Sequence, residues 1–265
     1  MQLRLYATVV GCALLLWVSP GYAQQSSPPS GSQVTSERLL NASEEPENWL
    51  MYSGEYSSQR YSRLTAIDKR NVDQLEVKWV KQLETLADVE TTPLVVDGVM
   101  YLTQSPSNVI ALDASTGSHF WSYEHTLPDK LALCCGRQNR GVAILGETLF
   151  LGTLDAKLMA LDAKTGAVQW EVQSADPATG YSKTAAPLVI GDKVISGIAG
   201  GEYGIRGFLD AYDAHTGERV WRFYTIPGEG EPHNDTWEGD SWKTCLLYTS
   251  DAADEGLGVA LGGRR

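Results

Sequence analysis

The chain has 265 residues, which suits one or two domains, and it carries 21 Lys and Arg against 33 Asp and Glu, a formal charge of −12. This acidic balance argues against a nucleic-acid partner, because binding nucleic acid needs a basic face that neutralises phosphates. Eight Trp and 12 Tyr against four Phe, together with 26 Gly, favour an all-β protein with many turns.

The first 23 residues have the layout of a secretory signal peptide. Arg4 gives a positive start, the run from Ala7 to Val18 is apolar, and Gly21-Tyr22-Ala23 is a small-x-small cleavage site. An uncleaved membrane anchor is the alternative, but the apolar run is shorter than a membrane span. We therefore predict an exported chain that is not an integral membrane protein. Residues 24–47, which begin with a polar stretch rich in Pro and Ser, are predicted to form a flexible leader.

A repeated motif, hydrophobic-D-A-x-T-G-x-x-x-W, determines the architecture predicted for residues 48–244. Its three copies span 112–121, 161–170 and 212–221, so their tryptophans lie 49 and 51 residues apart, and Trp79 ends an earlier, degenerate copy. The Asp of each copy can accept hydrogen bonds from its own turn, and the Gly can adopt a positive φ, so D-A-x-T-G predicts a hairpin turn. The strand after the turn ends in the Trp, whose ring can wedge between neighbouring sheets.

Each repeat also contains a strand-turn-strand pattern further upstream, as in 93–101 and 187–195. Four short strands in a period of about 50 residues are typical of a β-propeller blade. A β-sandwich is the alternative, but it does not explain why a tryptophan recurs at a fixed position after the turn.

Residues 48–244 resemble the N-terminal part of the PQQ-dependent (quinoprotein) alcohol and methanol dehydrogenases. The resemblance lies in the opening motifs Met51-Tyr52-Ser53-Gly54 and Arg60-Tyr61-Ser62-Arg63-Leu64, and in the repeats, which match the family's tryptophan-docking motifs. It implies an all-β fold, an eight-bladed β-propeller of which about the first half of the blades is present.

Several motifs match the family's cofactor site in the family's order. Cys134 and Cys135 are adjacent; from the residues alone they are either two buried thiols or a strained disulfide, because neighbouring Cα atoms lie about 3.8 Å apart, closer than ordinary disulfides require. The resemblance implies a vicinal disulfide that packs against one face of PQQ, which an oxidising compartment permits. It also implies that Arg140 binds a PQQ carboxylate through its planar guanidinium, that Glu90 binds ring substituents of the quinone, and that Thr153 contributes a hydroxyl.

A glycine-rich segment, 199–207, is the second of these motifs. Glycines let the backbone approach a flat cofactor, and the resemblance places Ala199, Gly200 and Gly201 against PQQ. Glu202 offers a hard carboxylate to a hard cation such as Ca²⁺, and the resemblance makes it a ligand of calcium or of a lanthanide. Many family members carry Ser where Ala199 stands, so one hydroxyl contact to the cofactor is missing here.

For a complete protein the resemblance implies periplasmic oxidation of a small alcohol to an aldehyde, with electrons passed to cytochrome c. No catalytic residue is assigned, because the resemblance places the general-base Asp beyond this sequence. The family pattern ends after Thr244, so residues 245–265 are predicted to be a foreign tail and this chain alone is expected to be inactive. Two alternatives stay open: a non-catalytic β-propeller scaffold of the outer-membrane assembly type, which needs no cofactor motifs, and a PQQ-dependent sugar dehydrogenase.

Overall fold

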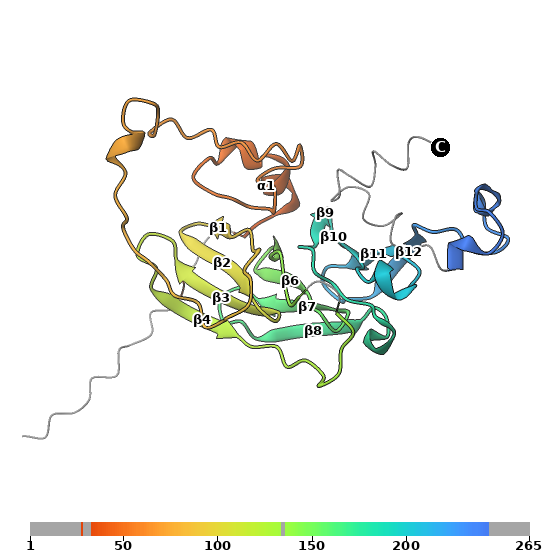
Figure 1. Ribbon diagram of the computed structural model, residues 1–265. Helices are drawn as coiled ribbons and strands as arrows, with labels where there is room; N and C mark the ends of the chain where they lie inside the picture. Colours follow the sequence, from red (N-terminus) through yellow and green to blue (C-terminus); the bar gives the residue numbers. More distant parts are fainter. Residues whose placement is uncertain (1–27, 29–32, 134–135, 244–265) are drawn as a thin grey trace, which may run out of the picture.

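Three four-stranded antiparallel sheets follow one another along the chain in the computed structural model, which describes residue 28 and residues 33–133 and 136–243 (Figure 1). The predicted signal peptide, the Cys134–Cys135 pair and the predicted foreign tail lie outside the described residues. In every sheet the strands pair in the order in which they occur in the sequence. The prediction of an all-β fold with four short strands per repeat is therefore confirmed.

The strands are short, three to six residues each. The first sheet contains β1 (Leu94–Val96), β2 (Val99–Gln104), β3 (Asn108–Asp113) and β4 (His119–Tyr123). The second contains β5 (Ala143–Leu145), β6 (Thr148–Gly152), β7 (Lys157–Asp162) and β8 (Val168–Gln173). The third contains β9 (Leu188–Ile190), β10 (Lys193–Gly197), β11 (Phe208–Asp213) and β12 (Arg219–Tyr224).

The turn between the third and fourth strands of each sheet forms as its sequence predicts. In the first sheet, Asp113 Oδ1 accepts hydrogen bonds from the backbone N–H groups of Ser115 (2.8 Å) and Thr116 (2.9 Å). Gly117 closes the turn with a φ of 72°, a conformation that costs glycine little. The D-A-x-T-G motifs at 162–166 and 213–217 repeat this arrangement.

A tryptophan joins each sheet to the turn of the next one. The indole Nε1 of Trp121, on β4, donates to the carbonyl of Ala163 (3.0 Å), and Trp170, on β8, donates to the carbonyl of Ala214 (3.3 Å). The ring of Trp121 also covers Gly166, where a Cβ would come within 2.6 Å of the ring. Trp79 makes the equivalent hydrogen bond to the turn of the first sheet. The motif thus explains why a tryptophan and a turn glycine recur together.

The three sheets share one end, which we call the loop end. The antiparallel register places the start of the first strand beside the end of the second, since Leu94 pairs with Tyr101 and Val96 pairs with Val99. The segments that enter β1, β5 and β9 therefore lie at the same end as the β2–β3, β6–β7 and β10–β11 connections. The D-A-x-T-G turns lie at the opposite end.

The prediction of a flexible leader over residues 24–47 is wrong for its described part. The helix α1 (Ser36–Leu40) is capped by Thr35, whose hydroxyl accepts from the backbone N–H of Arg38. Val34 and Leu39 are buried in the core, and Val34 forms a β-bridge with Gly146. These scattered apolar residues outweigh the polar composition and fasten the segment to the sheets.

The remaining helices are single 3₁₀ turns. They are η1 (Ala42–Glu44), η2 (Val72–Gln74), η3 (Pro177–Thr179), η4 (Gly201–Tyr203), η5 (Asn234–Thr236) and η6 (Ser241–Lys243). Within the described residues no helix has the length and apolar character needed to cross a membrane.

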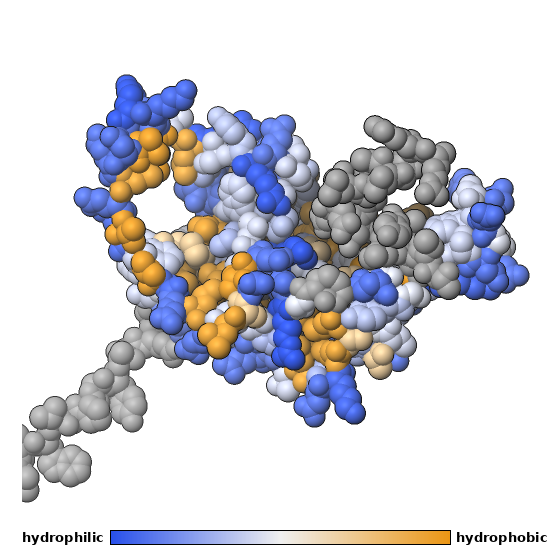
Figure 2. Space-filling model, in the orientation of Figure 1, coloured by the Kyte–Doolittle hydropathy of each residue, from blue (hydrophilic) through white to orange (hydrophobic). Residues whose placement is uncertain are grey.

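Apolar side chains stay exposed at two edges of the described structure. Residues 75–83, around Trp79, belong to no helix or strand and pair with no strand among the described residues, and Val77 and Val80 are exposed. The third sheet exposes Phe223, and its Trp221 is 42% exposed, whereas Trp121 is 7% exposed. Figure 2 shows apolar surface at several places on the face drawn.

Candidate cofactor and metal site

Three segments from different sheets meet at the loop end. The backbone N–H of Thr92, before β1, donates to the carbonyl of Arg140, before β5 (3.1 Å). The N–H of Arg140 in turn donates to the carbonyl of Thr184, before β9 (2.9 Å). These two hydrogen bonds fix the relative positions of three short segments that lie far apart in the sequence.

The side chains of these segments form a cluster, which we call the Arg140 cluster. Arg140 Nη2 lies 3.0 Å from Glu90 Oε2, and Arg140 Nη1 donates to Thr184 Oγ1 at 3.1 Å. The side chains of Arg140 and Glu90 are 37% and 40% exposed. A guanidinium has five N–H donors in a planar fork, so this one retains donors for a planar carboxylate. The structure therefore brings the predicted residues Glu90 and Arg140 together at an accessible place.

Thr184 was not among the predicted site residues, although the repeat contains a signal for it. Glu90 stands three residues before Pro93, which precedes β1, and Thr184 stands three residues before Pro187, which precedes β9. The two residues thus occupy the same position in two repeats. Aligning the repeats on the segments that precede their first strands, and not on their D-A-x-T-G turns, would have identified Thr184.

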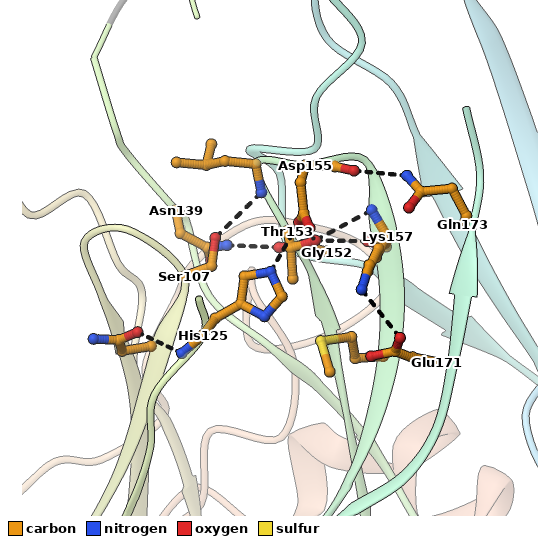
Figure 3. Close-up of polar contacts among 12 residues, drawn as sticks. Ser107, His125, Asn139, Gly152, Thr153, Asp155, Lys157, Glu171 and Gln173 are labelled. Atoms are coloured by element: carbon orange, nitrogen blue, oxygen red, sulfur yellow. Dashed lines mark hydrogen bonds and ion pairs between the residues drawn. The ribbon is translucent and has the colours of Figure 1, made fainter. Parts of the chain in front are cut away.

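Thr153 is buried, and its side chain belongs to a polar network with Asp155 and Lys157 (Figure 3). Its hydroxyl donates to Asp155 Oδ1 (2.5 Å) and accepts from the backbone N–H of Lys157 (3.1 Å). Asp155 also lies 2.8 Å from Nε2 of His125, another buried side chain. The hydroxyl of Thr153 is therefore engaged inside the protein, whereas that of Thr184 lies beside Arg140.

Asp155 is the charged centre of this buried network. Burial alone would raise the pKa of the Asp155 carboxyl, but the hydrogen bonds with His125 and Thr153 outweigh it and leave the pKa lowered. The carboxylate thus stays ionised and can hold the Thr153 hydroxyl and the His125 ring in fixed orientations. This arrangement supports the β6–β7 connection, and the Asn139 amide donates to the carbonyl of Gly152 beside it (2.7 Å).

The glycine-rich segment lies next to the segment that carries Thr184. Ser182 and Ala199 form a β-bridge through two backbone hydrogen bonds of 3.0 and 2.8 Å. Gly200 has a φ of 122°, and a Cβ there would overlap the carbonyl oxygen of Gly180. The absence of a side chain at Gly200 is therefore required by the protein's own backbone.

Glu202 is exposed, on the 3₁₀ turn η4 that begins at Gly201. Its carboxylate has no hydrogen bond or ion pair to the described residues. One carboxylate does not make a metal site, and the described residues contain no group of three or more His, Cys, Asp or Glu that could hold an ion. Glu202 can therefore supply one free hard ligand to a site whose other ligands come from elsewhere.

A cavity of about 240 Å³ lies at a different place, under the N-terminal segment. It is lined mainly by apolar residues of 50–58, of β5 and of β9, and it contains none of the residues of the Arg140 cluster. Charged donors suited to an anionic ligand are found at the cluster, so the chemistry indicates the cluster as the candidate site.

Comparison with known proteins defines the class. The β-propeller domain of the PQQ glucose/ethanol/alcohol dehydrogenases matches residues 49–260. The quinohemoprotein alcohol dehydrogenase ADH IIB of Pseudomonas putida is 44% identical over 220 residues, which cover 78% of this chain and 32% of that protein. The structure of the quinohemoprotein alcohol dehydrogenase ADHIIG from Pseudomonas putida HK5 has a TM-score of 0.73 at 42% identity and covers 78% of this chain and 32% of that one. A europium-containing methanol dehydrogenase has a TM-score of 0.73 at 35% identity and covers 78% of this chain and 40% of that one.

The chain thus forms part of a β-propeller domain of the quinoprotein type. It belongs to the family of PQQ-dependent glucose, ethanol and alcohol dehydrogenases, as its sequence motifs predict. It spans about a third of the length of the curated relatives it matches.

Replacement of Gly200 by alanine is expected to disrupt the glycine-rich segment. The new Cβ would overlap the Gly180 carbonyl and force a side chain into a strained φ, at a cost of about 1–3 kcal/mol for the strain alone. The test uses an extended chain, in which residues 1–244 are followed by the remaining part of a full-length relative, and compares unfolding in urea.

The matched control for this substitution is Gly204→Ala. Gly204 also has a positive φ, 70°, but a Cβ there meets no atom within 4 Å. It is expected to cost about 1 kcal/mol, the penalty of the left-handed conformation. Equal destabilisation by the two substitutions would show that the contact with Gly180 is unimportant.

Proposed function

We propose that this chain forms the first sheets of a quinoprotein dehydrogenase that oxidises small alcohols to aldehydes with PQQ and a bound metal ion. The observation that carries the proposal is the Arg140 cluster, where three segments converge on a guanidinium whose N–H groups are only partly engaged by the described residues. The relatives named above are alcohol or methanol dehydrogenases, which favours an alcohol over a sugar as the substrate. A propeller used only as a scaffold has no need for such a cluster.

The residues present fit an anionic, planar cofactor. In this proposal Arg140 binds a carboxylate of PQQ, Glu90 binds the ring substituents, and the hydroxyl contact comes from Thr184 in place of Thr153. Ala199, Gly200 and Gly201 lie along the cofactor, and Cys134 and Cys135 form the disulfide that covers one of its faces.

The metal site is completed by residues outside this chain. Glu202 supplies one carboxylate to Ca²⁺ or to a lanthanide, either of which prefers hard oxygen ligands. When bound, PQQ supplies the two-electron oxidation and the metal ion acts as a Lewis acid. The chain's own residues orient the cofactor, and the general base, an Asp, lies outside the sequence.

The wider setting of the enzyme is part of the same proposal. The tryptophan contacts between sheets continue around a closed ring of eight blades, of which the three described sheets and the segment around Trp79 are less than half. The signal peptide of residues 1–23 directs the protein to the periplasm, where cytochrome c accepts the electrons. In this proposal the chain without the remaining blades is inactive.

The test is uptake of PQQ and Ca²⁺ by the extended chain. Binding is monitored by the quenching of tryptophan fluorescence, and activity is measured as oxidation of ethanol with an artificial electron acceptor. Arg140→Met is expected to weaken PQQ binding about 10- to 100-fold, because a hydrogen bond to a charged group contributes about 1.5–3 kcal/mol. The matched control is Arg70→Met, since the side chain of Arg70 is 90% exposed and its ion pair, among the described residues, is with Asp68. Unchanged affinity in Arg140→Met would remove the Arg140 cluster from the site.

A further inference from the structure

Lys183 is a buried amine that the proposed function does not use. Lys183 is 2% exposed, and its Nζ donates to Ser196 Oγ (2.9 Å) and to the carbonyl of Gly197 (3.0 Å). The negative charge that most favours a protonated Lys183 is that of Asp210, whose carboxylate accepts hydrogen bonds from Arg222. Burial lowers the pKa of Lys183 to about 7, because the charge of Asp210 offsets only part of the desolvation and Arg222 opposes it.

The backbone of Lys183 lies between the two parts of the candidate site. The next residue, Thr184, belongs to the Arg140 cluster, and the preceding residue, Ser182, is bridged to Ala199 in the glycine-rich segment. The N–H of Lys183 donates to the carbonyl of Thr153 (3.0 Å), so its backbone is held from the second sheet as well.

The side chain of Lys183 reaches the strand from which the glycine-rich segment starts. Ser196 and Gly197 are the last two residues of β10, and only Ile198 separates Gly197 from Ala199. The amine therefore connects the segment that carries Thr184 to the start of the segment that carries Glu202.

Packing alone does not account for a lysine at this position. Burying an amine without a carboxylate partner costs free energy, whereas methionine would fill much of the same space without that cost. Residues that lower stability in this way are expected where they serve a functional site.

We propose that Lys183 is a positioning residue for the metal site: by binding Ser196 and Gly197, its amine fixes where the Glu202 carboxylate lies relative to Arg140 and Thr184. The inference rests on the proposed function and names a residue that acts only through others. Lys183 touches neither the cofactor nor the metal, so its effect is on the affinity for the ion.

The experiment compares Lys183→Met with the unsubstituted extended chain. The Ca²⁺ requirement is the Ca²⁺ concentration that gives half-maximal fluorescence quenching at saturating PQQ. The PQQ requirement is the PQQ concentration that gives half-maximal quenching at saturating Ca²⁺. Lys183→Met is expected to raise the Ca²⁺ requirement about 10-fold or more, the size of effect seen when groups that orient metal ligands are removed. The PQQ requirement is expected to change much less, and the urea midpoint of the apo-protein at pH 6 is expected to stay the same or rise.

Two further variants separate this role from a general effect on the fold. Ser196→Ala leaves only the bond to Gly197 and is expected to raise the Ca²⁺ requirement by a smaller factor. Lys193→Met, on the same strand, removes a lysine whose ion pair with Asp192 is at the surface and should leave both requirements unchanged.

Three outcomes would overturn the inference. A normal Ca²⁺ requirement in Lys183→Met would show that the amine does not position Glu202. A lower urea midpoint at pH 6 with equal losses of Ca²⁺ and PQQ affinity would show a purely structural role. Failure of the unsubstituted extended chain to take up Ca²⁺ and PQQ would reject the proposed function itself, which the first two outcomes would not.

Discussion

Replacing Trp121 with alanine is expected to lower the free energy of unfolding by about 3–5 kcal/mol, the usual cost of truncating a buried tryptophan. Trp121 is 7% exposed, its ring lies 6.0 Å from that of Tyr101, and it covers the turn of the second sheet at Gly166. The substitution would leave a cavity between two sheets and remove the hydrogen bond to the Ala163 carbonyl.

Urea unfolding of the extended chain, followed by circular dichroism, measures this effect. Trp121→Phe is the informative companion, because it keeps an aromatic ring over Gly166 but removes the indole N–H. It is expected to cost about 1–2 kcal/mol, from one neutral hydrogen bond and a small loss of contact. A cost below about 1 kcal/mol for alanine would show that the sheets are held together mainly by other contacts.

The second large effect is a pH-dependent change in stability caused by Lys183. Its pKa is lowered from 10.5 to about 7 in the folded state, so between these values the unfolded chain holds a proton that the folded chain lacks. Stability due to this group therefore rises with pH from about 7 to about 10.5 and is lowest, and constant, below pH 7. The full difference corresponds to about 5 kcal/mol before the two hydrogen bonds of the amine are counted.

Lys183→Met should remove this dependence. The substituted apo-protein is expected to be more stable than the unsubstituted one at pH 6, by up to a few kcal/mol after about 1 kcal/mol is lost for each hydrogen bond. The stability advantage of Lys183→Met over the unsubstituted protein should shrink, and then reverse, as the pH approaches 10. Denaturant unfolding at pH 6, 8 and 9.5 tests this, and a difference that is independent of pH would show that the amine keeps an ordinary pKa.

The sequence predicted those features of the fold that depend on short-range chemistry. The D-A-x-T-G turns form because Asp113 and its equivalents bond to residues two and three positions away, and such contacts can be recognised in a single repeat. The recurrence of Trp121 at a fixed distance from the turn likewise predicted four-stranded units that pack in series.

The features that the sequence did not predict concern contacts between distant segments. Val34 and Leu39 fasten α1 to the sheets, but two apolar residues in a polar stretch give no periodic signal. The hydroxyl of Thr184 bonds to Arg140, whereas that of Thr153 bonds to Asp155. Thr184 could have been found by comparing its position before Pro187 with that of Glu90 before Pro93. The hydroxyl of Thr153 is used by Asp155, a contact within the same loop that could have been considered from the sequence.

The segment around Trp79 affects the order in which parts of the protein can fold during synthesis. The three described sheets are built from neighbouring hairpins, so each can form soon after it leaves the ribosome. Residues 75–83 are synthesised before the three sheets. No described strand pairs with them, and Val77 and Val80 are exposed. An unpaired segment with exposed apolar side chains favours aggregation, so we expect this early segment to add to the aggregation risk of the nascent chain.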